Sequence, residues 1–177
     1  AGGKGTRMRP LTNNTPKPLL KVNGKPMLGL ILDSLKDQGF KKIYISVNYL
    51  HKKIEKFINK YHADLQIKIF KEKKELGTAG SLFFLKKEKI KDPVIIINSD
   101  VLTNFDYNRL MEQHIKSKKK FSILSKNISL KIPYGVIDGD NKKKGSFNKI
   151  KEKPNLNFSV MSGVNCISPS VLKLIKN

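Results

Sequence analysis

The residues best suited to binding a polyanion lie at the start of the chain. It begins Ala1-Gly-Gly-Lys-Gly-Thr-Arg-Met-Arg-Pro10. Glycines permit positive φ and leave the backbone bare, so successive N–H groups can point at one anion. Arg7 and Arg9 are two of only three arginines, and a guanidinium binds phosphate oxygens in pairs. This composition predicts a phosphate-binding loop, although a flexible turn on a basic surface would also explain it.

A second cation follows in Thr15-Pro-Lys-Pro-Leu-Leu20, where Pro16 and Pro18 flank Lys17. Proline restricts its own φ and the residue before it, which would fix the direction of the Lys17 ammonium. Two well-known phosphate loops are excluded. The string G-x-x-x-x-G-K-[ST] is absent, and G-x-G-x-x-G fails because Met8 stands where the last glycine would be.

The whole string GGKGTRMRPLTNNTPKPLLKVNGKPM closely resembles the signature loop of sugar-1-phosphate nucleotidyltransferases. The resemblance implies that the loop cradles the triphosphate of an NTP, and that Arg7 and Lys17 are catalytic. The triphosphate-binding residues would be Ala1, Gly2, Gly3, Gly5 and Thr6.

A carboxylate suited to Mg²⁺ follows the apolar run 93–97, in Asn98-Ser-Asp100. Ligands bind at the carboxyl ends of parallel strands, and Mg²⁺ often takes one or two carboxylates plus phosphates and water. A turn-capping Asp is the alternative. The segment resembles the family motif whose Asp binds Mg²⁺, which implies that Asp100 is both the metal ligand and a catalytic residue.

The string Leu76-Gly-Thr-Ala-Gly-Ser81 joins a predicted strand to a predicted helix. Small residues let a base or ribose approach the backbone, although a simple turn is the alternative. The wording resembles the family's nucleoside-binding turn, which implies nucleotide contacts from Gly77, Thr78 and Gly80. Glu72 and Glu75 either contact base or ribose or are plain surface charges.

Two later strings, Tyr134-Gly-Val and Glu152-Lys-Pro, resemble the family's sugar-phosphate segments. By that resemblance Glu152 accepts hydrogen bonds from sugar hydroxyls and Lys153 holds the sugar phosphate. Two solvated charges are the alternative reading. Gly135 would expose backbone to the sugar, and Gly163 belongs to a third sugar-contacting strand. That strand departs from the family pattern at Met161, Ser162 and Asn165.

Composition narrows the classes of protein. The 177 residues are 38% hydrophobic and carry a net charge of +22. Because the lysines are spread along the chain without interleaved aromatics, we expect compositional bias and no nucleic-acid binding. No apolar run is long enough for a membrane span, and no signal peptide is visible. The single Cys166 fits a reducing, cytoplasmic location and reads as a small buried strand residue.

Hydrophobic patterning predicts alternating helices and strands. Helices are expected over 26–39, 49–61, 78–89, 105–116 and 169–175. Strands are expected over 43–47, 65–70, 93–97, 121–126, 134–138, 147–153 and 164–167, with a turn at 139–141. This order predicts a doubly wound, Rossmann-like α/β fold, with a mixed, mostly parallel sheet and helices on both faces. The family's GT-A-like fold agrees.

A glycine-rich phosphate loop normally follows a strand, so we expect one strand before Ala1. The family also has a second Mg²⁺-binding Asp beyond Asn177, so the fold is expected to be truncated at both ends. Residues 1–177 would form a single partial catalytic domain. Its nucleotide-binding half is 1–100, and 101–177 begins the sugar-phosphate half.

The predicted reaction is NTP + sugar 1-phosphate ⇌ NDP-sugar + pyrophosphate, with Mg²⁺ as cofactor. The residues of these motifs most resemble those of the GDP-sugar branch of the family, such as mannose- or glucosamine-1-phosphate guanylyltransferases. A uridylyl-, thymidylyl- or cytidylyltransferase remains open, and so does a non-catalytic nucleotide-sugar-binding regulatory module. Further domains or a homo-oligomer are open for the full-length protein.

Overall fold

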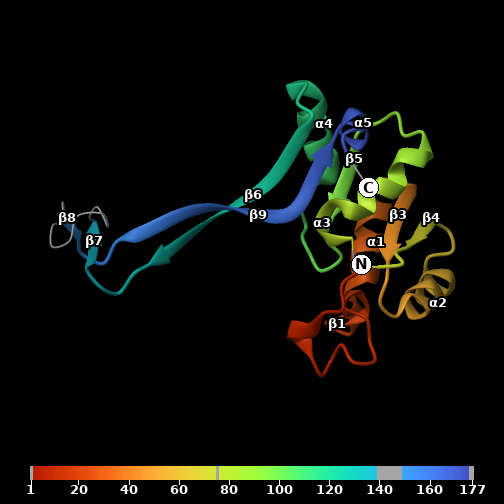
Figure 1. Ribbon diagram of the computed structural model, residues 1–177, viewed down its shortest axis with the longest axis horizontal. Coiled ribbons are helices and arrows are strands. Elements are labelled where there is room, and N and C mark those ends of the chain that lie inside the picture. Colours follow the sequence, from red (N-terminus) through yellow and green to blue (C-terminus); the bar gives the residue numbers. More distant parts are fainter. Residues whose placement is uncertain (1, 75, 139–148, 176–177) are drawn as a thin grey trace. The chain divides into compact units, whose positions relative to one another are not determined.

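The computed structural model describes residues 2–74, 76–138 and 149–175 (Figure 1). The chain forms two compact units. The first comprises Ala1–Ile123 and Gly163–Asn177, and the second comprises Leu124–Ser162. Ala1, Glu75 and the predicted turn at 139–141 lie outside the described residues.

The first unit holds all the helices of the described residues and a pair of parallel strands. Its elements before residue 75 are η1 Thr6–Met8, η2 Lys17–Leu19, β1 Lys21–Val22, β2 Lys25–Pro26, α1 Met27–Asp37, β3 Lys42–Val47, α2 His51–Tyr61 and β4 Gln66–Lys71. Those that follow are α3 Gly77–Gly80, η3 Ser81–Glu88, β5 Val94–Ile97, α4 Tyr107–Ser117 and α5 Pro169–Leu172.

Helix α1 shows why helices could be predicted from the spacing of apolar residues. Its buried residues recur at helical spacing, so one apolar stripe faces the core: Leu28, Ile31, Leu32 and Leu35. The chain leaves the helix through Gly39, whose φ is +84°. Glycine adopts that left-handed conformation at little cost. The predicted helices over 26–39, 49–61 and 105–116 are confirmed as α1, α2 and α4.

Strands β3 and β4 pair in parallel, with Ile43 opposite Ile67 and Ile45 opposite Ile69. Ile43, Ile45 and Val47 are buried, as expected when alternate side chains share one face of a strand. The strands predicted over 43–47 and 65–70 are therefore confirmed, within one residue at each end.

The expectation of one mixed, mostly parallel sheet is confirmed only in part: the α/β fold and the parallel pair β3–β4 are present, but the described strands form separate sheets. The run predicted as a central parallel strand, β5, pairs antiparallel with β9, Asn155–Ile167. The third strand of that sheet is β6, Phe121–Lys131, in the order β5-β9-β6. The structure thus shows a mixed α/β fold with separate short sheets, because no described strand joins β3 to β5.

Strands β6 and β9 and helix α5 differ in length from the sequence prediction, and one predicted helix is of another type. Strands β6 and β9 run well beyond the predicted 121–126 and 164–167. Polar and apolar residues alternate at Asn155-Leu-Asn-Phe-Ser-Val160, which is the strand period. Most of the helix predicted over 78–89 is the 3₁₀ segment η3, and α5 ends at Leu172.

Cys166 is fully buried in β9, which confirms its predicted role as a small strand residue. Burial raises the pKa of its thiol to about 11, so the thiol stays protonated at neutral pH. His114 and His62 are also buried. His114 joins α4 to the chain around it, because its ring nitrogens lie 2.7 Å from Ser122 Oγ and 2.9 Å from Ser168 Oγ.

The second unit is a β ribbon. Its strands β7, Val136–Asp138, and β8, Lys149–Lys151, pair antiparallel with Ile137 opposite Ile150. The Ile132 N–H donates to the Pro154 carbonyl at 3.0 Å. None of the helices described here is long and apolar enough to cross a membrane.

Candidate active site

Gly5 shapes the N-terminal loop. Its φ is +62°, and its carbonyl accepts hydrogen bonds from the Met8 N–H at 2.9 Å and Thr12 Oγ1 at 2.8 Å. A Cβ on Gly5 would stand 3.0 Å from Thr12 Cγ2 and 3.3 Å from Lys17 Cβ. Gly5 thus has the positive φ that glycine permits, and a Cβ there would be accommodated only if Thr12 or Lys17 shifted slightly.

Several other residues of the loop are exposed to solvent. Thr6 and Arg7 are exposed on the single turn η1, and Arg9 follows it. Nothing lies within 4 Å of a Cβ built on Gly3. The backbone at Gly3 and the Arg7 guanidinium are thus accessible to a ligand.

Lys17 reaches Asp100, and this contact joins two predicted catalytic residues. Lys17 Nζ donates to Asp100 Oδ2, and the two groups form an ion pair. Their side chains are 32% and 36% exposed. Pro16 and Pro18 are fully buried beside Lys17, which anchors the backbone that carries its side chain. An ion pair this exposed contributes about 0–1 kcal/mol, so a ligand can replace it at small cost.

The loop that carries Asp100 packs against Gly163. The Asn98 N–H donates to the Gly163 carbonyl at 3.0 Å. Gly163 has φ +83°, and a Cβ there would lie 2.8 Å from Val101 Cγ2 and 2.9 Å from Asn98 Nδ2. This packing by itself explains why position 163 is glycine. A sugar contact from Gly163 stays a prediction.

The structure gives Glu72 several contacts, although the sequence did not decide between a binding role and a plain surface charge. Its carboxylate accepts hydrogen bonds from Ser46 Oγ at 2.6 Å and the Leu76 N–H at 3.4 Å. A Cβ built on Gly2 would lie 3.0 Å from both carboxylate oxygens. The Glu72 N–H also donates to the Val47 carbonyl at 2.8 Å. Glu72 therefore links the end of β3, the N-terminal loop and the turn before α3.

The Gly77-Thr78-Ala-Gly80 segment forms the short helix α3. Gly77 has φ +73° with nothing within 4 Å of its Cβ position, so its backbone faces open space. Gly80 is closely packed, since its Cβ would lie 2.4 Å from Leu76 Cβ. The structure thus leaves room for a ligand at Gly77, whereas Gly80 shapes the turn.

The second unit brings together three of the predicted sugar-phosphate residues. A Cβ on Gly135 would lie 3.2 Å from Glu152 Oε2. Lys153 Nζ lies 3.7 Å from Glu152 Oε1, and the two side chains are 60% and 71% exposed. Both charged groups are therefore available to a ligand from solvent.

A metal site can be assessed from the donor set. Across the described residues, no group of three or more His, Cys, Asp or Glu side chains could hold a metal ion. Asp100 offers one accessible carboxylate with a cation already at one oxygen. That fits Mg²⁺, which keeps few protein ligands when substrate phosphates complete its shell.

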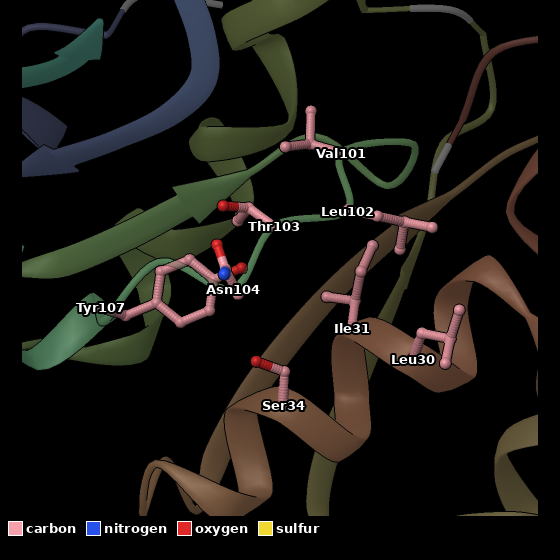
Figure 2. A pocket seen from close by; sticks show the side chains of 8 residues that line it. All are labelled: Leu30, Ile31, Ser34, Val101, Leu102, Thr103, Asn104 and Tyr107. Atoms are coloured by element: carbon pink, nitrogen blue, oxygen red, sulfur yellow. The ribbon is translucent and has the colours of Figure 1, made fainter. Parts of the chain in front are cut away.

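A separate pocket lies between α1 and the chain after Asp100 (Figure 2). Its volume is about 410 Å³. The residues that line it are Leu30, Ile31, Ser34, Val101, Leu102, Thr103, Asn104 and Tyr107. No predicted phosphate-, nucleoside- or sugar-binding residue is among them, and none carries a charge. The pocket is therefore not the predicted nucleotide site.

Comparison with known proteins decides the family. The model of the Nucleotidyl transferase family matches residues 1–176. The chain belongs to this family of enzymes. The resemblance read from the N-terminal loop is thereby confirmed.

Curated relatives match over nearly the whole chain. It is 33% identical to a mannose-1-phosphate guanyltransferase of Debaryomyces hansenii over 181 residues, covering 99% of this chain and 50% of the relative. Mannose-1-phosphate guanylyltransferase 1 of Arabidopsis thaliana is also 33% identical, with 99% and 50% covered. The chain thus spans about half the length of these relatives.

Solved structures support the fold. HddC from Yersinia pseudotuberculosis matches with TM-score 0.76 and 26% identity, covering 100% of this chain and 78% of that one. A putative glucose-1-phosphate thymidylyltransferase from Bacillus anthracis matches with TM-score 0.73 and 22% identity, covering 100% and 74%. At 22% identity, the similarity to the second structure is evidence for the fold alone.

Proposed function

We propose that the protein transfers a nucleoside monophosphate from an NTP to a sugar 1-phosphate and releases pyrophosphate. The observation that carries this proposal is the Lys17–Asp100 ion pair beside the glycine loop. It puts a cation and a carboxylate together where the loop offers bare backbone, and we infer that this carboxylate binds the metal. A reaction between two polyanions needs that combination of positive charge and positioning.

Each residue has a distinct role in this scheme. The sugar-phosphate oxygen attacks the α-phosphorus in line, and pyrophosphate leaves. Arg7 and the backbone of the N-terminal loop hold the β- and γ-phosphates. Lys17 exchanges Asp100 for the α-phosphate and neutralises the charge that develops there. Asp100 would hold Mg²⁺, which when bound supplies further neutralisation of the phosphates.

The remaining predicted residues bind the two substrates. Gly77, Thr78 and Gly80 form the turn against the nucleoside. Lys153 holds the phosphate of the sugar 1-phosphate, and Glu152 accepts hydrogen bonds from sugar hydroxyls. The backbone at Gly135 and Gly163 contacts the sugar.

Guanine is the base that Glu72 favours. A carboxylate accepts hydrogen bonds and donates none when ionised. The Watson–Crick edge of guanine presents two adjacent donors, N1–H and N2–H₂, whereas uracil and thymine present one. The curated relatives named above are guanylyltransferases, and HddC was also solved in a complex with GMP-PN. These facts support GTP as the donor, and the names of the curated relatives support mannose 1-phosphate as the acceptor. Glucosamine 1-phosphate is supported only by the resemblance of the sequence motifs.

The test is pyrophosphate release by the full-length protein. Four NTPs are paired with a panel of sugar 1-phosphates, and GTP is expected to react fastest. Preference for UTP, dTTP or CTP would reject the assignment of Glu72. No release from any pair, with nucleotide-sugar binding retained, would favour the regulatory module.

A further inference from the structure

Residues 9–16 connect the two cations to which catalytic roles are assigned above, Arg7 and Lys17. They belong to no helix or strand. A turn in this segment is closed by the Asn13 N–H, which donates to the Pro10 carbonyl at 3.1 Å. Because a short turn fixes only its own residues, the position of the segment depends on its contacts with the rest of the first unit.

Two side chains at the start of α2 hold this segment by its backbone. Tyr49 Oη, just before the helix, donates to the Asn13 carbonyl at 2.7 Å. Lys53 Nζ, in the first turn of the helix, donates to the Asn14 carbonyl. A hydrogen bond from an ammonium is charge-assisted and stronger than one between neutral groups. Since both acceptors are backbone oxygens, these bonds fix the path of the chain itself.

Leu50 lies between the two donors and has φ +52°. A residue with a Cβ rarely adopts this left-handed conformation, which persists only where surrounding contacts hold it and is common at functional sites. Here the donors on either side of Leu50, Tyr49 and Lys53, bind carbonyls of adjacent residues. The unusual turn therefore belongs to the arrangement that holds residues 9–16.

The same part of the chain also binds Glu72. Ser46 Oγ donates to the Glu72 carboxylate at 2.6 Å, and Asn48 Nδ2 donates to the Glu72 carbonyl at 2.9 Å. Glu72 is the carboxylate proposed above to read the base. Residues 46–53 thus contact both that carboxylate and the segment that leads to Lys17.

A series of contacts connects Tyr49 to Lys17. Asn13, whose carbonyl accepts from Tyr49, follows Thr12, which is 1% exposed. The Thr12 hydroxyl donates to the Gly5 carbonyl at 2.8 Å. A Cβ built on Gly5 would lie 3.3 Å from Lys17 Cβ. Movement of the segment at Asn13 would therefore disturb the packing beside Lys17.

We propose that Tyr49 and Lys53 are positioning residues, which hold residues 9–16 so that the Lys17 ammonium stays at Asp100 and at the site of the α-phosphate. The part played by Lys17 rests on the proposed function, whereas the hold on the segment does not. A displacement of about 1 Å can lower a rate about 10²-fold. Because neither side chain touches a substrate in this scheme, their loss should lower kcat and leave KM nearly unchanged.

The first experiment is hydrogen exchange on the full-length protein without nucleotide. Peptides that cover residues 9–16 are expected to exchange at least about threefold faster in Tyr49→Phe, because the segment loses a bond to the rest of the unit. Peptides of α1 and α4 should be unchanged. Tyr61→Phe is the control, since it removes a hydroxyl from a side chain that is 60% exposed at the end of α2. Equal exchange of residues 9–16 in both variants and the wild type would overturn the proposal.

Lys53 is tested in the same way with Lys53→Met. Its matched control is Lys52→Met, which removes the same charge from an exposed neighbouring residue. Faster exchange of residues 9–16 in Lys53→Met alone is the expected result. Equal exchange in the two lysine variants would overturn the role assigned to Lys53.

The second experiment measures pyrophosphate release from GTP and mannose 1-phosphate by steady-state kinetics. Tyr49→Phe should lower kcat about tenfold and change each KM less than about twofold, whereas Tyr61→Phe should change neither. Combined with Lys17→Ala, Tyr49→Phe should cause little further loss, because residues that act as a unit are not additive. A purely structural effect would give the same fold-loss with and without Lys17, and that result would overturn the positioning role.

The two experiments separate this proposal from the proposed function. If Lys17→Ala alone left kcat unchanged, the catalytic role of Lys17 would be rejected, and the kinetic consequence of Tyr49 with it. The exchange experiment involves no substrate, so it would still decide whether Tyr49 and Lys53 hold residues 9–16.

Discussion

Arg7 is exposed in the turn η1, so it contributes little to packing and is free to act on a ligand. Arg7→Ala is expected to lower kcat about 10²–10³-fold, by analogy with the loss of one donor to a developing charge. The free energy of unfolding should stay within about 0.5 kcal/mol. Steady-state kinetics and urea unfolding measure the two effects.

The matched control for Arg7 is Arg109→Ala, which removes an exposed arginine from α4. It should leave kcat unchanged. If both variants lost activity equally, the effect would belong to net charge and Arg7 would have no special role.

Asp100 contacts Lys17 and is partly exposed to solvent. Its proposed role as a metal ligand can therefore be tested by replacing it with asparagine. Asp100→Asn should weaken Mn²⁺ binding in the presence of GTP at least about tenfold, because an amide carries no charge to hold a hard cation. Electron paramagnetic resonance measures free Mn²⁺ directly. Asp92→Asn, at an exposed aspartate, is the control. An unchanged Mn²⁺ titration for Asp100→Asn would remove it as a ligand.

At this scale the sequence singles out Arg7, Lys17 and Asp100, whose catalytic roles stay predictions, but it does not predict the contact between the last two. They are 83 positions apart, so their contact depends on tertiary structure. Glu72 was ambiguous for the same reason. Its partners Ser46 and Gly2 come from other parts of the chain, and nothing in the local string separates it from a surface charge.

Elements with strong local signals were predicted well, and the parallel pairing of β3 with β4 agrees with the prediction, but the antiparallel pairing of β5 with β9 does not. The apolar stripe of α1 and the alternation in β3 are properties of a few neighbouring residues. The antiparallel partner of β5 is β9, about 70 positions along the chain. An apolar run such as Val94–Ile97 fits either a parallel or an antiparallel neighbour, so composition could not choose between them.

Gly163 connects two elements, β9 and the loop after β5, and its substitution tests that contact. Gly163→Ala combines the cost of positive φ with a Cβ placed 2.8 Å from Val101 Cγ2. The expected loss is about 1–2 kcal/mol from φ and about 1–3 kcal/mol from overpacking. Urea unfolding measures the total.

Gly39→Ala separates these two costs, because Gly39 has nearly the same φ, +84°, and nothing within 4 Å of its Cβ position. It should show the conformational cost alone. Equal destabilisation by Gly163→Ala and Gly39→Ala would mean that the contact with Val101 relaxes freely.

At the scale of the whole molecule, the net charge of +22 is the dominant electrostatic property. Such a charge attracts any polyanionic substrate at low ionic strength, and salt weakens that attraction. Because of this attraction, removing any exposed lysine could weaken substrate binding even if that lysine does not contact the substrate. A specific role of Lys153 must therefore be distinguished from the general effect of removing one positive charge.

Lys153→Ala is compared with Lys149→Ala and Lys151→Ala, which remove the same charge from the same stretch of chain. If Lys153 holds the sugar phosphate, its loss should raise KM for the sugar 1-phosphate about tenfold or more and change KM for the NTP much less. The two controls should shift both KM values slightly, and that shift should disappear at high salt, where exposed charges are screened. Steady-state kinetics of all three variants at two ionic strengths provide the measurement. Equal and salt-sensitive losses in all three would assign the effect to net charge, and Lys153 would then have no contact of its own with the sugar phosphate.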